Sequence, residues 1–196
     1  MIQPGRIIIL SGPSGAGKTT LHDRLLQDPR FKGRLIRSVS ATTRKPRAGE
    51  RNGREYFFLT RKMFEYKVRS GHFLEWMKVF DNYYGTPLKN VRAALRRGQY
   101  VLLCIDVKGA GAVKKEFPDA LMVFVRTPTL EVLRRRLVAR GTDSSQSVAL
   151  RLKTAGVELK QAAAYDHVIV NGDLEAAYAR LAEVVASLTF PTGCVI

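Results

Sequence analysis

The sequence predicts an α/β fold of three layers, in which a parallel sheet lies between two layers of helices and carries a small α+β insertion. Three observations predict this fold. Short apolar runs alternate with longer segments of helical periodicity along the chain. A glycine-rich turn, residues 12–17, follows the first apolar run directly. Between residues 35 and 87 the pattern changes to short, aromatic-rich runs joined by turns.

The core strands are almost continuous runs of apolar residues, which is typical of strands buried on both faces of a parallel sheet. We predict them at residues 6–11, 100–106, 120–125 and 167–170. Helical patterns lie between and after these runs, at residues 21–26, 130–138, 148–164 and 174–188. The polar stretch 140–147 is expected to be a mobile loop between two of these helices.

The predicted insertion contains aromatic-rich runs at residues 56–59 and 72–80 and a helix at residues 61–70. Thr60 is placed as the N-cap of this helix and Gly71 as its stop. We therefore separate the insertion, residues 35–87, from the predicted core.

The charge of the chain is unusual, because its formal net value is +16 over 196 residues. Nine basic residues and a single acidic one, Glu50, lie between Arg30 and Arg54. A second basic group follows later in the chain, at Arg134, Arg135, Arg136, Arg140, Arg151 and Lys153. Part of this charge is expected on an ordinary solvated surface, but the clustering predicts anionic partners such as nucleotides, nucleic acid or acidic surfaces.

We expect a cytoplasmic protein without a membrane partner, either a monomer or a homodimer. No apolar run approaches the roughly 18 residues that a membrane span needs. The first residues lack the basic and apolar regions of a signal peptide. Two cysteines, Cys104 and Cys194, provide no disulfide or metal framework.

The stretch "SGPSGAGKTT" contains the spacing Gly12-x-x-x-x-Gly17-Lys18-Thr19. Glycines let backbone N–H groups converge on an anion, and the following helix directs its N-terminus at the same point. Lys18 can reach the β- and γ-phosphates, and the Thr19 hydroxyl suits a Mg²⁺ ligand shell. The predicted core is therefore a P-loop domain that binds a nucleoside triphosphate with Mg²⁺, and a chance glycine-rich turn is the alternative. The binding residues are expected to be Gly12, Pro13, Ser14, Gly15, Ala16, Gly17, Lys18, Thr19 and Thr20.

A second anion site is predicted in "SVSATTRKPRAGERNGREYFF". Arg44 and Arg47 flank a Lys-Pro pair that favours an extended or turn conformation, so that two guanidinium groups can close on one phosphate. Tyr56 and Tyr84 offer hydroxyl donors. Each arginine alone is equally compatible with a surface cation, but the set favours a phosphate site.

Glu75, in "FLEWM", is surrounded by apolar residues, where an unpaired carboxylate is costly. It is expected either to form a salt bridge or to accept the adjacent N1–H and N2–H donors of guanine, which adenine lacks. Thr86 is a candidate donor to guanine O6, or else a helix cap before Pro87. Asp106 follows a core strand and is a candidate site acid, a helix cap, or both.

Seven segments resemble the guanylate kinase family in order and spacing, from about residue 7 to residue 188. They are "GPSGAGKTT", "SVSATTRKPRAGE", "GREYFF", "FLEW", "YYGTP", "RRRLVARGTDS" and "YDHVIVN". The resemblance implies transfer of the γ-phosphoryl group of ATP to GMP, a GMP-binding insertion, and a helical lid that closes during turnover. It thereby divides the chain into a core of residues 1–34, 88–126 and 159–196, the insertion of residues 35–87, and the lid of residues 127–158.

The resemblance also assigns residues. For GMP they are Ser40, Arg44, Arg47, Glu50, Tyr56, Glu75, Tyr84, Thr86 and Asp106, with Glu50 orienting the two arginines. For ATP, Arg140 and Asn171 join the P-loop residues, and the groups implied in catalysis are Lys18, Arg44, Arg140 and Arg151. Three positions depart from the family pattern: Cys104 and Gln146 stand where an acid is common, and Gly172 replaces a common aspartate.

Three other functions remain as alternatives. They are a same-fold kinase for another phosphorylated small molecule such as a ribose phosphate, a non-catalytic module that binds a phosphorylated protein, and nucleic-acid binding driven by charge. Lys18, Thr19 and the lid arginines favour catalysis, and Glu75 favours guanine. Nucleic acid is not expected as the main partner, because the chain lacks a recognisable nucleic-acid-binding motif. Whether dGMP also serves as acceptor is left open.

Overall fold

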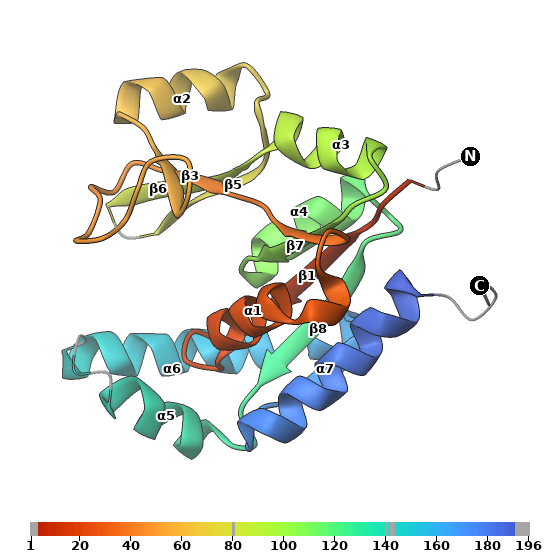
Figure 1. The fold of residues 1–196 in the computed structure, drawn as a ribbon. Helices are drawn as coiled ribbons and strands as arrows, with labels where there is room; N and C mark the ends of the chain where they lie inside the picture. Colours follow the sequence, from red (N-terminus) through yellow and green to blue (C-terminus); the bar gives the residue numbers. More distant parts are fainter. Residues whose placement is uncertain (1–3, 80, 140, 142–143, 191–196) are drawn as a thin grey trace.

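A computed structural model describes residues 4–79, 81–139, 141 and 144–190 (Figure 1). The larger sheet contains β1 (Ile7–Ser11), β2 (Leu35–Arg37), β7 (Tyr100–Cys104), β8 (Leu121–Arg126) and β9 (His167–Val170). The smaller sheet contains β3 (Ser40–Thr42), β4 (Tyr56–Phe58), β5 (Phe73–Val79) and β6 (Asn82–Pro87). The α-helices are α1 (Lys18–Gln27), α2 (Arg61–Arg69), α3 (Leu88–Arg96), α4 (Val107–Glu116), α5 (Leu130–Ala139), α6 (Ser145–Leu159) and α7 (Leu174–Thr189). None of the helices in this part of the chain is long and apolar enough to span a membrane.

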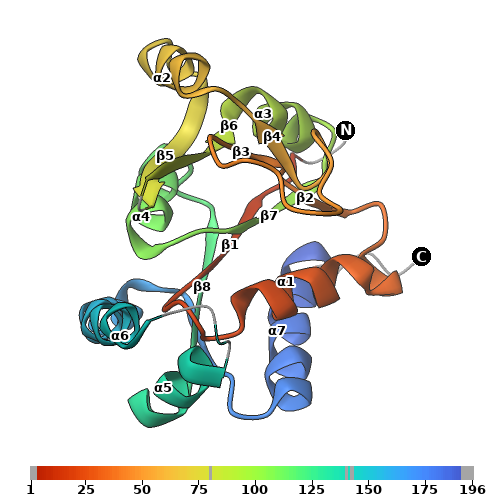
Figure 2. The same ribbon diagram turned by 90° about the vertical axis from the view of Figure 1, so that its left-hand side faces the viewer.

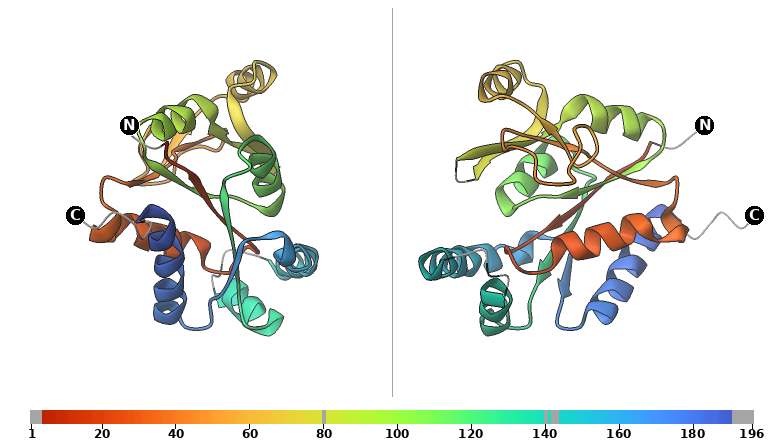
Figure 3. Two further views of the ribbon diagram at one scale, coloured as in Figure 1. Left: turned by 90° about the vertical axis from the view of Figure 1, so that its right-hand side faces the viewer. Right: turned by 60° about the vertical axis from the view of Figure 1, so that its left-hand side comes forward.

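The larger sheet is parallel throughout, in the order β2-β7-β1-β8-β9. Side chains of β1 alternate between the two faces, so that Ile8 and Leu10 pack with α1 and α7, whereas Ile7 and Ile9 pack with α3 and α4. Figure 3 shows α7 and α4 on opposite sides of this sheet. The predicted three-layer α/β/α fold is therefore confirmed.

The smaller sheet has the order β4-β3-β6-β5, with antiparallel pairing of β6 to both β3 and β5. Helix α2 lies beside it, and its Phe64 stacks on Phe73 and Tyr83. The Thr60 hydroxyl accepts a hydrogen bond from Met63 N at 3.2 Å, which confirms the predicted N-cap. Figures 1 and 2 show this sheet with α2 on one side of the β1–α1 loop and α5 with α6 on the other.

Two details of the fold differ from the sequence prediction. Strand β2 pairs with β7 in the larger sheet, and the smaller sheet begins only at Ser40. A strand of three residues with a single buried side chain, Leu35, is too short to give a periodic signal. The predicted end of the loop at residues 140–147 was also wrong. Helix α6 already begins at Ser145, and the Ser144 hydroxyl caps it by accepting from Ser147 N. Serines favour helix caps as well as loops, which explains the error.

Candidate active site

The loop between β1 and α1 turns on three glycines with positive φ. Gly12, Gly15 and Gly17 have φ values of 128°, 92° and 93°. A Cβ atom on Gly12 would lie 2.1 Å from the Val125 carbonyl oxygen, so only glycine fits there. The loop therefore runs close to the end of β8 and leads directly into the N-terminus of α1, the geometry that favours an anion.

Lys18 is the first residue of α1, and its side chain reaches back over the loop. Its Nζ donates to the carbonyl oxygens of Gly12 at 2.5 Å and Pro13 at 2.9 Å. These contacts hold the ammonium group beside the loop backbone. Thr19 and Thr20 follow on the first turn of the helix, and Ala16 is fully buried beneath it.

Glu75 and Thr86 face each other across β5 and β6. The Thr86 hydroxyl donates to Glu75 Oε1 at 2.6 Å, and both side chains are buried. The salt bridge considered for Glu75 is not found among the described residues, and the N-cap of α3 is Pro87 rather than Thr86. The Thr86 hydroxyl, the candidate donor to guanine O6, here orients the Glu75 carboxylate.

Asp106 lies close to Glu75 and also caps α4. Its Oδ1 accepts from Gly109 N at 2.7 Å. A Cβ atom on Gly109 would lie 3.1 Å from Glu75 Oε2 and 3.4 Å from Asp106 Oδ1, so the two carboxyl groups share one small space. Burial raises the pKa of Glu75 to about 7, and the charge of Asp106 adds to this effect. A neighbouring pair of N–H donors would favour the ionised form of Glu75.

We predict that Glu75 makes the free energy of unfolding fall as the pH rises from about 4.5 to 7. In that window the unfolded chain releases the proton of this carboxyl group, whereas the folded chain keeps it. The shift from 4.5 to about 7 corresponds to about 3 kcal/mol. Urea unfolding from pH 4.5 to 8 tests this: the stability of Glu75→Gln should rise relative to the native chain across the window, and parallel curves contradict the prediction.

The second anion site is organised by Glu50. Its Oε1 accepts from Arg44 Nη2 at 2.8 Å, and its Oε2 accepts from the backbone N of Arg47 at 2.7 Å. Arg44 lies 5.5 Å from the ring centre of Tyr56, and the rings of Tyr56 and Tyr84 meet edge-on at 6.0 Å. The Arg44 guanidinium lowers the pKa of Glu50. Arg44, Tyr56 and Tyr84 thus lie close together, and Glu50 holds both the Arg44 guanidinium and the backbone of Arg47.

A polar pocket of about 110 Å³ lies between this site and the first turn of α1. Thr19 lines it from α1, Ser40 from β3 and Tyr56 from β4. The exposed thiol of Cys104 lies at the same pocket. The pocket thus brings Thr19 of the predicted ATP site beside Ser40 and Tyr56 of the predicted GMP site.

The helices of the predicted lid contact the loop through Arg151. Its Nη1 donates to the Ser14 hydroxyl at 3.0 Å, from α6 to the loop. Gln146 is exposed on the first turn of the same helix. Arg140, the other arginine predicted here, lies outside the described residues.

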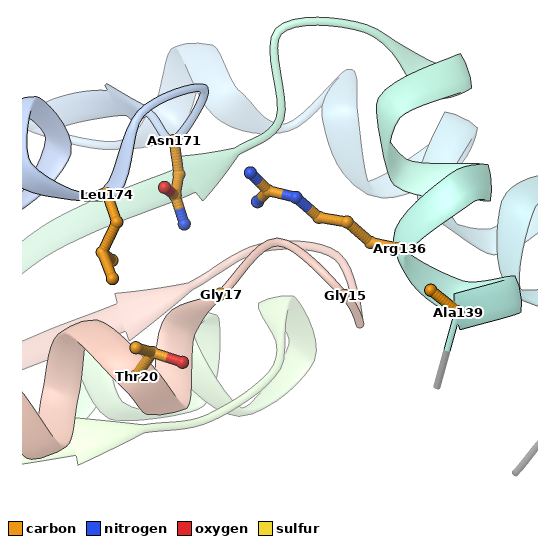
Figure 4. Close-up of a pocket in the computed structure, with 7 residues that line it drawn as sticks. All are labelled: Gly15, Gly17, Thr20, Arg136, Ala139, Asn171 and Leu174. Atoms are coloured by element: carbon orange, nitrogen blue, oxygen red, sulfur yellow. The ribbon is translucent and has the colours of Figure 1, made fainter. Parts of the chain in front are cut away.

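A further cavity of about 370 Å³ lies on the other side of the loop, lined by Gly15, Gly17, Thr20, Arg136, Ala139, Asn171 and Leu174 (Figure 4). Asn171 is buried, and its Nδ2 donates to Ala16 O at 2.8 Å. Its Oδ1 is also buried and has no hydrogen-bond partner within the described part of the chain. Arg136 points toward Asn171 in Figure 4 and donates to Gly172 O at 3.3 Å. Sequence analysis counted Arg136 only as part of a basic group and did not place it at this site.

A sequence model of the guanylate kinase family matches residues 4–188 of the chain. A guanylate kinase of Rubrobacter xylanophilus is 47% identical over 180 residues, which cover 92% of this chain and 93% of the relative. One of Symbiobacterium thermophilum is 45% identical over 92% of this chain and 84% of the relative. The crystal structure of guanylate kinase from Anaplasma phagocytophilum matches with a TM-score of 0.76 and 32% identity, over 97% of this chain and 89% of that one. The chain belongs to the guanylate kinase family.

Proposed function

We propose that this chain transfers the γ-phosphoryl group of ATP to GMP, giving ADP and GDP. The observation that carries the proposal is the polar pocket that Thr19 of α1, just after the glycine loop, shares with Ser40 and Tyr56 of the insertion. We expect the donor phosphate at the loop and the acceptor phosphate at the insertion to meet at this pocket. Family membership supports the same reaction.

GMP is expected to bind in the insertion. Glu75 accepts the N1–H and N2–H groups of guanine with its carboxylate, which Thr86 orients, and Ser40 adds a hydroxyl at the edge of the same site. The phosphate of GMP is held by Arg44, Arg47, Tyr56 and Tyr84. Asp106 lies between GMP and ATP. Binding replaces the unfavourable burial of an unpaired carboxylate by two charge-assisted hydrogen bonds. The same contacts leave dGMP as a second candidate acceptor.

ATP is expected to bind along the loop from Gly12 to Thr20. Lys18 leaves the carbonyl groups of Gly12 and Pro13 and moves to the β- and γ-phosphates. Arg151 and Arg140 add positive charge from the lid, and the contact of Arg151 with Ser14 supports this role for Arg151. The buried Oδ1 of Asn171 accepts from the adenine amino group in the cavity beside Arg136.

The residues around the loop fit a magnesium ion that arrives with ATP. Among the described residues there is no group of three His, Cys, Asp or Glu side chains that would hold a metal by itself. Thr19 offers one hard oxygen ligand, whereas the Cys104 thiol is a soft ligand that magnesium avoids. When bound, Mg²⁺ would neutralise charge on the phosphates of ATP.

The transfer needs positioning and positive charge more than acid–base chemistry. The nucleophile is a phosphate oxygen of GMP, which is already ionised, so no general base is required. Lys18, Arg44, Arg140 and Arg151 neutralise the charge that spreads over the transferred group. Closing of the lid over the loop excludes water and suppresses hydrolysis of ATP.

A coupled assay for ADP with ATP and Mg²⁺ tests the proposal, with GMP, AMP, CMP and UMP compared as acceptors. We expect ADP to form rapidly with GMP alone, because only guanine matches the Glu75 carboxylate. ADP formation without preference among the acceptors contradicts the role given to the insertion. Binding of GMP without any ADP formation would instead favour a non-catalytic module.

A further inference from the structure

Arg37 lies at the carboxyl end of β2, outside the segments that resemble the family. Arg37 pairs in register with Leu102 of the neighbouring strand β7, and β7 ends two residues later at Cys104. Figure 2 shows β2 and β7 side by side. Because the carboxyl ends of parallel strands form the ligand-binding edge of such sheets, the fold places the Arg37 side chain at the edge that also carries the glycine loop.

The Arg37 side chain lines the pocket that connects the two phosphate sites, together with Thr19, Ser40 and Tyr56. Its charge affects groups on two sides of that pocket. Burial raises the pKa of Tyr56, and the Arg37 guanidinium opposes this effect. Burial also lowers the pKa of His22 on α1, and Arg37 lowers it further. The guanidinium group therefore lies between α1 and the insertion.

The Arg37 guanidinium is weakly engaged compared with that of Arg44, which Glu50 holds at 2.8 Å. Within the described residues its ion-pair partner is Asp23, at 3.6 Å from Nη2 to Oδ1, and it makes no side-chain hydrogen bond. Both side chains are more than 40% exposed, so the pair contributes little. Asp23 has a closer partner, because the same Oδ1 lies 2.8 Å from His22 Nδ1.

We propose that Arg37 is a third phosphate-binding arginine of the acceptor site, which leaves Asp23 and donates to the phosphate of GMP while Asp23 stays with His22. The inference rests on the proposed function. A guanidinium group offers five donors in a planar fork that matches a phosphate. Arg44 is turned toward Glu50 and Lys45 O, whereas Arg37 faces the junction with its donors available.

Titration of GMP in the absence of ATP tests this on the native chain and on Arg37→Ala and Arg37→Lys. We expect the Kd of GMP to rise about tenfold in Arg37→Ala, as for one lost charged hydrogen bond, with partial recovery in Arg37→Lys. KM for GMP should rise similarly and kcat should change less. Arg96→Ala is the matched control, because this exposed arginine ends α3. Its neighbour Leu95 accepts from Gly5 N just before the amino end of β1, whereas Arg37 lies at the carboxyl end of β2.

The variant Asp23→Asn distinguishes two roles of Arg37: binding of the GMP phosphate, and a structural ion pair with Asp23. If Arg37 serves only Asp23, Asp23→Asn weakens GMP binding as much as Arg37→Ala, and the double variant loses nothing more. Under the proposal, Asp23→Asn binds GMP at least as well as the native chain, and adding Arg37→Ala to it again weakens binding about tenfold.

Three further results separate the possible failures. A loss confined to the affinity for ATP with Mg²⁺ overturns the inference, because it assigns Arg37 to the other phosphate. Unchanged GMP binding in Arg37→Ala, with normal turnover in the native chain, overturns the inference alone. A native chain that neither binds nor phosphorylates GMP overturns the proposed function on which the inference rests.

Discussion

Lys18→Ala should lower kcat by about 10³-fold, which is the effect expected when a charged group that stabilises a phosphoryl-transfer transition state is removed. In the structure the ammonium group lies on the loop itself, held by the carbonyl oxygens of Gly12 and Pro13. A bound triphosphate offers stronger, charged acceptors at the same place, so we expect the lysine to move only a short way. Alanine keeps α1 intact, because it is the best helix former.

The measurement is the rate of ADP formation at saturating ATP and GMP, with the melting temperature recorded for each variant. Lys32→Ala is the matched control, since Lys32 is an exposed lysine that follows a short helical turn after α1. We expect the control to keep native turnover. If Lys18→Ala stayed within tenfold of the native kcat while ADP formation still required GMP, Lys18 would have no part in the transition state.

Glu75→Gln should lower kcat/KM for GMP by about 10²- to 10³-fold, because two charge-assisted hydrogen bonds to guanine are lost or weakened. The glutamine keeps the size of the side chain and its contact with Thr86, but it presents an N–H group where guanine also presents one. Adenine has an acceptor at N1, so activity with AMP should rise relative to activity with GMP. The buried setting of Glu75 makes this mismatch costly, since water has little access to correct it.

Steady-state rates with GMP and AMP for the native chain, Glu75→Gln and Glu65→Gln measure this preference. Glu65 is the matched control, because it lies on α2 of the same insertion and pairs with Arg61 in an i,i+4 contact. The control should keep the native preference for GMP. An unchanged ratio of GMP to AMP activity in Glu75→Gln would mean that another group reads the base.

Much of this fold was predictable because its signals are local. The four apolar runs that were expected to be core strands appear as β1, β7, β8 and β9. The glycine loop was also predictable. Positive φ favours glycine at individual positions, and the sequence has glycine at the three positions that adopt it, Gly12, Gly15 and Gly17. The buried position of Glu75 could be expected from its apolar neighbours alone.

Other parts of the site depend on contacts between distant segments. Nothing near Asp106 in the sequence indicates that its carboxyl group lies beside that of Glu75, or that Arg136 of α5 faces Asn171 across the loop. Arg37 was counted only as one basic residue among many, because β2 is too short to show a period.

The sequence by itself determined the four apolar runs that become core strands, the position of the glycine loop, and the burial of Glu75. Only the tertiary structure decided which strand ends lie side by side, and therefore that Arg37 of β2 joins Thr19 and Tyr56 at one pocket. The physical reason is that burial and backbone conformation follow the residues of a single segment. Strand order and the meeting of side chains follow from packing of the whole chain.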